Sequence, residues 1–197
     1  MGQIIISVGR EFGSGGRVIA EALAERFNIP IYDRHLITEI AERTGLTPEE
    51  IERYNEHPKK KIISRRVRGY SNSIEDNIAE MQFNFLNEKS KSGESFVVVG
   101  RCSETKLKNN PALISLFVLA DMEAKVKRVM KVYELSEDDA IEFIRKKDKK
   151  RKRYHNYHCS GHWGDSRLYD LCINSSRLGI EKTVDYLEDY IRARADI

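Results

Sequence analysis

Residues 4–17 have the sequence IIISVGREFGSGGR, and this stretch decides the fold. The β-branched run at its start is typical of a strand that is buried on both faces of a parallel sheet. Ile19, Leu23 and Phe27 then follow at helical spacing. Between strand and helix, three glycines let backbone N–H groups converge on phosphate oxygens at the positive end of the helix. The stretch predicts a phosphate-binding turn formed by Gly13, Ser14, Gly15, Gly16 and Arg17, with Val18 beside it.

The spacing of this turn differs from the two best-known phosphate motifs. No G-x-G-x-x-G occurs, and the pattern G-x-x-x-x-G-K-[ST] would need glycine at Arg10 and lysine at Gly16. Arg17 is the nearest cation, one position late, and Val18 follows in place of a hydroxyl that could hold magnesium. A glycine-rich connection without a ligand is the other interpretation, but three glycines weaken a turn that has no need of an exposed backbone.

Strands and helices alternate along the rest of the chain. We expect further strands at residues 31–34, 96–99, 113–119 and 169–174, and helices at 18–26, 35–44, 74–89, 122–133, from 136 onward, and 180–194. Another helix starts at Thr47, and the polar, basic residues 56–73 are predicted to be a mobile connection. This order indicates a doubly wound α/β sheet of about five parallel strands in a single domain, residues 1–197.

Composition narrows the class of protein. The chain has 197 residues, of which 40% are hydrophobic and 33% charged, as in globular proteins. With 34 basic and 31 acidic residues, the net charge of +3 does not by itself imply nucleic acid. Three cysteines without close pairing argue against a disulfide framework, and no stretch resembles a membrane span or signal peptide. We expect a cytoplasmic protein with neither a membrane nor a nucleic-acid partner.

Several motifs in order resemble those of the cytidylate kinase-like family, a branch of the nucleoside monophosphate kinases. After the turn at 9–17 they are Tyr-Asp-Arg-His-Leu-Ile at 32–37, Val-Val-Gly-Arg at 98–101, Asp-Lys-Lys-Arg at 148–151, Trp-Gly-Asp at 163–165 and Tyr-Asp-Leu-Cys-Ile-Asn at 169–174. The resemblance implies a P-loop NTPase-type three-layer sandwich that uses ATP and Mg²⁺ to phosphorylate a nucleoside monophosphate, CMP or dCMP.

The resemblance also implies a role for individual residues. Residues 13–18 would bind the ATP phosphates, an acceptor-side segment would span about 34–92, and a basic lid would span about 145–165. Asp33, Arg34 and Arg101 would face the acceptor. Arg17, Arg101, Lys149 and Arg151 would be the catalytic cations, because phosphoryl transfer depends on positioning and on neutralising negative charge. We expect the lid to be open without phosphate, since its eight basic residues repel one another.

Two departures from the cytidylate kinase pattern leave other functions open. Gly16 replaces the usual lysine, and Cys102 replaces an aspartate after Arg101. Arg17 could supply the lost charge, and Glu11 or Asp33 could hold magnesium through water. The alternatives are a nucleotide-binding regulatory module without turnover and a small-molecule kinase with another acceptor. An RNA-binding protein would rest only on the basic runs at 59–68 and 145–153.

A second cluster suggests metal chemistry. His155, His158, Cys159 and His162 are close in sequence, but their spacing is irregular and Tyr154, Tyr157 and Trp163 around them favour a packed border of the lid. We therefore expect no metal ligands there, and interpret Cys102 as a small packing residue.

Overall fold

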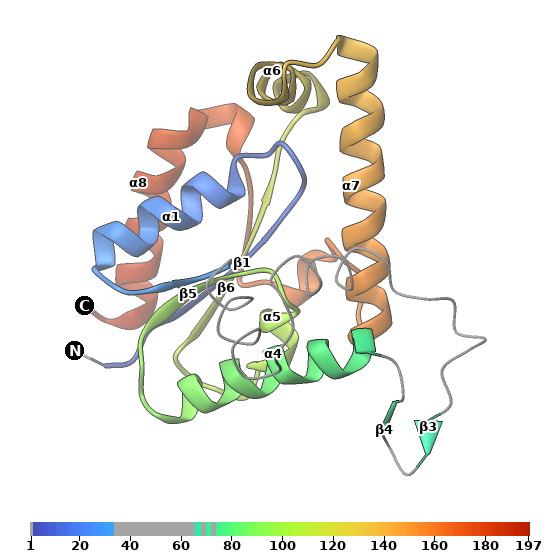
Figure 1. The fold of residues 1–197 in the computed structure, drawn as a ribbon. Coiled ribbons are helices and arrows are strands. Elements are labelled where there is room, and N and C mark those ends of the chain that lie inside the picture. Colours follow the sequence, from blue (N-terminus) through green and yellow to red (C-terminus); the bar gives the residue numbers. More distant parts are fainter. Residues whose placement is uncertain (1, 34–65, 68–69, 72–73) are drawn as a thin grey trace.

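A five-stranded parallel sheet forms the centre of the molecule (Figure 1). The computed structural model describes residues 2–33, 66–67, 70–71 and 74–197. The strands lie in the order β2-β5-β1-β6-β7 and all pair in parallel. They are β1 (Ile5–Arg10), β2 (Ile31–Tyr32), β5 (Phe96–Val99), β6 (Leu113–Leu119) and β7 (Leu171–Asn174). The central strand β1 is almost fully buried, which explains its unbroken apolar run.

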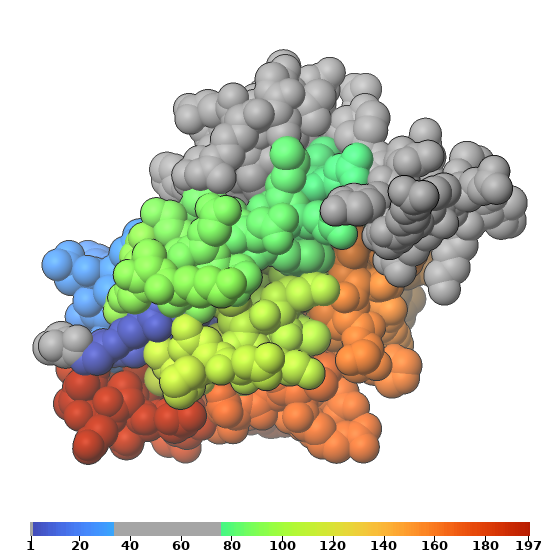
Figure 2. All heavy atoms as spheres, turned by 90° about the horizontal axis from the view of Figure 1, so that it is seen from below, coloured from blue at the N-terminus to red at the C-terminus, as the bar shows by residue number. Residues whose placement is uncertain are grey.

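Helices cover both faces of this sheet, so successive side chains of β1 enter two different cores. On one face, Ile6 packs with Leu23 of α1 (Gly16–Phe27) and Leu187 of α8 (Ser175–Ala195). On the other face, Ile5 packs with Phe85 of α4 (Ile74–Lys91), and α5 (Ser103–Lys106) lies beside α4. In Figure 2, α4 lies next to the segment that contains α5, and the second half of α7 borders both.

Two further helices stand at the carboxyl end of the strands. These are α6 (Met122–Tyr133) and α7 (Glu137–His158), which pack around Val129 and Ile144 with Phe12 against them (Figure 1). Ser136 starts α7 because its side chain accepts a hydrogen bond from the Asp139 amide at 3.3 Å. The remaining elements are a 3₁₀ helix (Ser166–Leu168) and a hairpin of β3 (Arg66–Val67) and β4 (Tyr70–Ser71).

The expected α/β sheet is confirmed, with its strands and most of its helices. The closing helix begins earlier than predicted, at Ser175, because the Asn174 side chain caps it and the chain continues through a kink at Gly179 (φ 76°). The predicted helix 35–44, the helix start at Thr47 and most of the connection 56–73 lie outside the described residues. Among the helices that are described, none is long and apolar enough to cross a membrane.

Candidate functional site

The glycine-rich turn forms a loop at the amino end of α1 whose amides are open to a ligand. Gly13 and Gly15 have φ angles of 79° and 80°, which favour glycine. Ser14 is fully buried and closes the loop, because its hydroxyl donates to the Glu11 carbonyl at 2.9 Å. Among the described residues, the amides of Gly13, Gly15 and Arg17 have no hydrogen-bond partner. These amides, at the positive end of a helix dipole, form a cradle for an anion.

Side chains of α6 contact this loop and hold it in place. Arg128 donates a hydrogen bond to the Gly13 carbonyl, and its guanidinium lies close to Gly15. Lys125, whose side chain is only 6% exposed, pairs with Glu11 at 3.1 Å and with Asp148 at 3.4 Å. Asp148 in turn accepts a hydrogen bond from the Phe12 amide at 2.6 Å. The loop is therefore joined to both α6 and α7 by buried polar contacts.

Three arginines meet next to the loop, and part of their hydrogen-bonding capacity is unused. Arg151 donates to the Arg10 carbonyl at 3.1 Å. Burial, with Arg151, Arg101 and Arg17 nearby, lowers the pKa of Arg10 to about 9, while Asp33 opposes that shift. The Nε atoms of Arg10 and Arg101 are buried without a hydrogen-bond partner among the described residues. Orphaned cationic donors of this kind are satisfied when a multivalent anion enters.

An unusual turn after β5 presents Arg101. Gly100, Arg101 and Cys102 have φ angles of 74°, 62° and 55°, so three consecutive residues adopt the left-handed region. That conformation is uncommon for arginine and cysteine and is typical of functional sites. Hydrogen bonds of Ser103 to the Gly100 carbonyl and to Ser7, each at 2.7 Å, fix the turn to the centre of the sheet.

One face of α7 completes the site. Lys147, Lys150, Arg151 and Tyr154 follow at spacings of three and four residues, and all four line the same pocket. Lys149, predicted as a catalytic cation, is instead exposed and does not line the pocket, because it lies on another face of the helix. Its neighbour Lys150 does line the pocket, so we add Lys150 as a candidate for the second lid cation, and the role of Lys149 stays a prediction. Residues 145–158, expected as the first part of an open lid, are the second half of one continuous helix docked on the loop.

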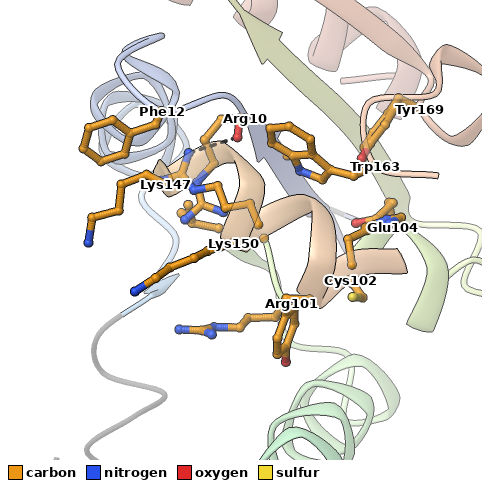
Figure 3. Close-up of a pocket in the computed structure, with 15 residues that line it drawn as sticks. Arg10, Phe12, Arg101, Cys102, Glu104, Lys147, Lys150, Trp163 and Tyr169 are labelled. Carbon is orange, nitrogen blue, oxygen red and sulfur yellow. Dashed lines mark hydrogen bonds and ion pairs between the residues drawn. The ribbon is translucent and has the colours of Figure 1, made fainter. Parts of the chain in front are cut away.

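The three arginines, the turn after β5 and the basic face of α7 surround a pocket of about 240 Å³, and the loop from Gly13 to Arg17 lies outside its lining (Figure 3). The charged ends of Arg101, Lys147 and Lys150 point to the same side of the view, away from Cys102 and Glu104. Aromatic rings of Phe12, Trp163 and Tyr169 line other parts of the wall. Cations held between aromatic walls suit a ligand that has phosphates and a flat apolar part.

Three other predicted site residues, Arg17, Val18 and Asp33, do not line this pocket. The Arg17 side chain is 47% exposed and pairs with Glu21 at 2.9 Å and with Asp33 at 3.5 Å. Val18 is 52% exposed on the first turn of α1. Arg34, predicted to face the acceptor, lies outside the described residues. The structure thus brings Arg17 and Asp33 together at the edge of the arginine cluster.

Sequence reasoning missed Arg10, Lys125, Arg128 and Lys150 as site residues. Lys150 could have been found from the helical spacing of the basic run. Lys125 and Arg128 gave no local signal, because Arg128 reaches a carbonyl 115 positions away in the sequence. Of the histidines and cysteine weighed as metal ligands, His155 and Cys159 lie together, and the partner that joins them is Glu104, which the sequence did not suggest.

Comparisons with known proteins agree with this arrangement. The model of the cytidylate kinase-like family matches residues 5–177. Cytidylate kinase of Thermococcus kodakarensis is 28% identical over 181 residues, which are 90% of this chain and 82% of that protein. A solved structure of an uncharacterized protein from Eubacterium ventriosum is 39% identical, with a TM-score of 0.76 over 96% of this chain and 98% of that one. Shikimate kinase from Bacteroides thetaiotaomicron, 17% identical with a TM-score of 0.55 over 96% and 98%, shares the fold.

Proposed function

Since this chain belongs to the cytidylate kinase-like family, we propose that it is a nucleoside monophosphate kinase that transfers a phosphoryl group from ATP to CMP or dCMP. The observation that carries the proposal is the pair of buried Nε atoms on Arg10 and Arg101, which have no hydrogen-bond partner among the described residues. Both arginines line the same pocket as the basic face of α7. A site with unused cationic donors on several sides fits a reaction that joins two phosphates.

Each side of the pocket has its own part in this proposal. The loop from Gly13 to Arg17 holds the phosphates of ATP, with Arg17 and Arg128 as the nearby cations. Arg101 holds the acceptor phosphate, because a guanidinium fork binds phosphate with two hydrogen bonds. Arg151 and Lys150 lie over the point of transfer, where they stabilise the charge on the migrating group.

The carboxylates around the loop fit the cation that accompanies ATP. Glu11 and Asp148 are both paired with Lys125. Asp33 makes a longer contact, 3.5 Å to the half-exposed Arg17, whereas Lys125 is almost fully buried; we therefore take Asp33 as the candidate to hold Mg²⁺ through water. There it would supply positive charge that offsets the charge of the ATP phosphates.

The test is a turnover assay with ATP against CMP, dCMP, UMP and other monophosphates, using wild type, Arg101→Ala and Arg101→Lys. We expect CMP or dCMP to be phosphorylated fastest. Arg101→Ala should raise the KM for the acceptor by about a hundredfold, since losing a charge-assisted contact costs a few kcal/mol. The KM for ATP should change little, and lysine should restore little because it has no fork.

Arg167→Ala is the matched control, because Arg167 is 85% exposed and pairs only with Asp165 in a surface contact. It should behave as wild type. Wild type that binds ATP but phosphorylates no acceptor in the panel would contradict the proposal and favour a regulatory module. Turnover of an acceptor that is not a nucleotide would favour a small-molecule kinase.

A further inference from the structure

Four side chains of types that bind metals lie where α7 ends and α5 begins; two of them, Cys102 and Glu104, are seen in Figure 3 on the side of the pocket away from the charged tips. Two of them, His155 and Cys159, are four residues apart at the end of α7 and so share one face of that helix. The other two, Cys102 and Glu104, flank Ser103 at the start of α5. Two short pairs from two separate elements are the usual arrangement of zinc ligands.

The donor atoms of this group are close together. Those of Glu104, His155 and Cys159 all lie within 4.8 Å of one another. The buried Cys102 thiol lies near the Cys159 thiol. Sulfur and imidazole donors together suit zinc, whereas magnesium prefers oxygen.

The hydrogen bonding of His155 gives an independent indication of a missing ligand. The residue is only 5% exposed, and its Nε2 lies 2.7 Å from Oε1 of Glu104. Its other nitrogen, Nδ1, is buried and has no hydrogen-bond partner among the described residues. A buried ring nitrogen rarely stays unpaired. Metal-bound histidines in proteins commonly have this arrangement, with a carboxylate on one nitrogen and the metal on the other.

We propose that the chain binds one Zn²⁺ through the thiolates of Cys102 and Cys159 and Nδ1 of His155, with Glu104 orienting the imidazole. The fourth position faces the pocket, which Cys102, Glu104 and His155 line. Zinc would fasten the end of α7 to the turn that carries Arg101, so it is a structural clamp beside the phosphate site.

The experiment measures metal binding directly, without using kinase activity. Reduced, metal-free protein is titrated with Zn²⁺ against a chromophoric chelator, and Co²⁺ is substituted to detect the thiolate-to-metal charge-transfer band. We expect one metal per chain. X-ray absorption should give Zn–S at about 2.3 Å and Zn–N at about 2.0–2.1 Å. Cys159→Ser and His155→Gln should lose this binding. Glu104→Gln should weaken it by about 10- to 100-fold, as for other groups that orient a ligand.

Two further variants separate ligation from folding. Cys172→Ser removes the third cysteine, on β7, and should bind zinc as wild type does. His155→Cys replaces one ligand with another and should keep the metal even if His155→Gln folds poorly, as followed by circular dichroism. The proposal is overturned if reduced wild type takes up no zinc. It is equally overturned if Cys159→Ser binds zinc as tightly as wild type, or if the two thiols form a disulfide whose reduction yields no zinc uptake.

Discussion

At the scale of single residues, the cation that replaces the missing lysine can be identified by mutation. Arg17 is held by Glu21 and Asp33, whereas Arg128 is held against the loop itself. If Arg17 contacts the transferred group, Arg17→Ala should slow turnover by about a hundredfold, because a transition-state contact is lost. Arg128→Ala should mainly raise the KM for ATP. Both are measured by steady-state kinetics at varied ATP.

The control for this pair is Arg26→Ala. Arg26 is also on α1 but pairs with Asp185 and Glu188 of α8, far along the helix from the loop. Its replacement should leave turnover unchanged. A fully active Arg17→Ala together with a slow Arg128→Ala would assign the replacement role to Arg128.

Gly15 offers a second test at this scale. Its φ is 80°, and a Cβ there would lie 2.2 Å from Cδ1 of Ile180. Gly93 has nearly the same φ, 81°, with nothing within 4 Å of an added Cβ. Both substitutions by alanine cost about 1–2 kcal/mol from the left-handed backbone, but only Gly15→Ala also forces Ile180 or the loop to shift. We expect calorimetry to show lost ATP binding for Gly15→Ala and intact binding for Gly93→Ala. Equal ATP affinities would count against the loop as the ATP site.

Local patterns predicted the backbone of the site better than its side chains. The glycines were evident because a turn of that composition needs positive φ angles. Arg10, Arg128 and Glu104 were not evident, since their roles depend on contacts with residues far away in the sequence. Only the packed fold brings these partners together.

At the scale of elements, α7 presents different side chains on different faces. Arg151 and Lys149 are two positions apart, yet only Arg151 lines the pocket. Arg151→Ala should slow phosphoryl transfer by about a hundredfold, while Lys149→Ala should stay within about twofold of wild type, as surface changes usually do. Single-turnover kinetics would compare the two directly. A strong loss in Lys149→Ala would mean that the helix rotates or moves when substrates bind.

Helices could be predicted where the hydrophobic periodicity and the capping residues indicated the same boundaries. The helix at residues 122–133 has the predicted bounds, and Ser136 caps α7 as expected. The docking of α7 on the loop was not foreseen, because charge repulsion among basic residues suggested an open lid. Asp148 offsets this repulsion, because it accepts a hydrogen bond from the Phe12 amide and also pairs with Lys125.

At the scale of the whole molecule, clustered arginines should make folding stability depend on anions. Repulsion among Arg10, Arg101 and Arg151 destabilises the free protein, and a multivalent anion relieves it. Sulfate should therefore raise the Tm more than chloride at equal ionic strength. A ligand at a hundred times its Kd adds about 2.7 kcal/mol of stability. Differential scanning fluorimetry measures this.

The same measurement on Arg101→Ala is the control for site-specific binding. The extra effect of sulfate over chloride should shrink in that variant, because one unpartnered donor is gone. An unchanged difference would mean that sulfate acts on the protein surface in general.

The position of Arg10 also has an evolutionary consequence. A Cβ at Gly16 would lie 2.5 Å from Cβ of Arg10, and one at Gly100 would lie 2.2 Å from its guanidinium. Every residue other than glycine has a Cβ at this place, so a lineage with arginine at position 10 cannot acquire the usual lysine at position 16 in a single step without a backbone shift. Residues 10 and 16 should therefore covary among descendants of a common ancestor, with glycine at position 10 wherever position 16 carries a side chain. The absence of the lysine at position 16 and the presence of arginine at position 10 would then have been inherited together.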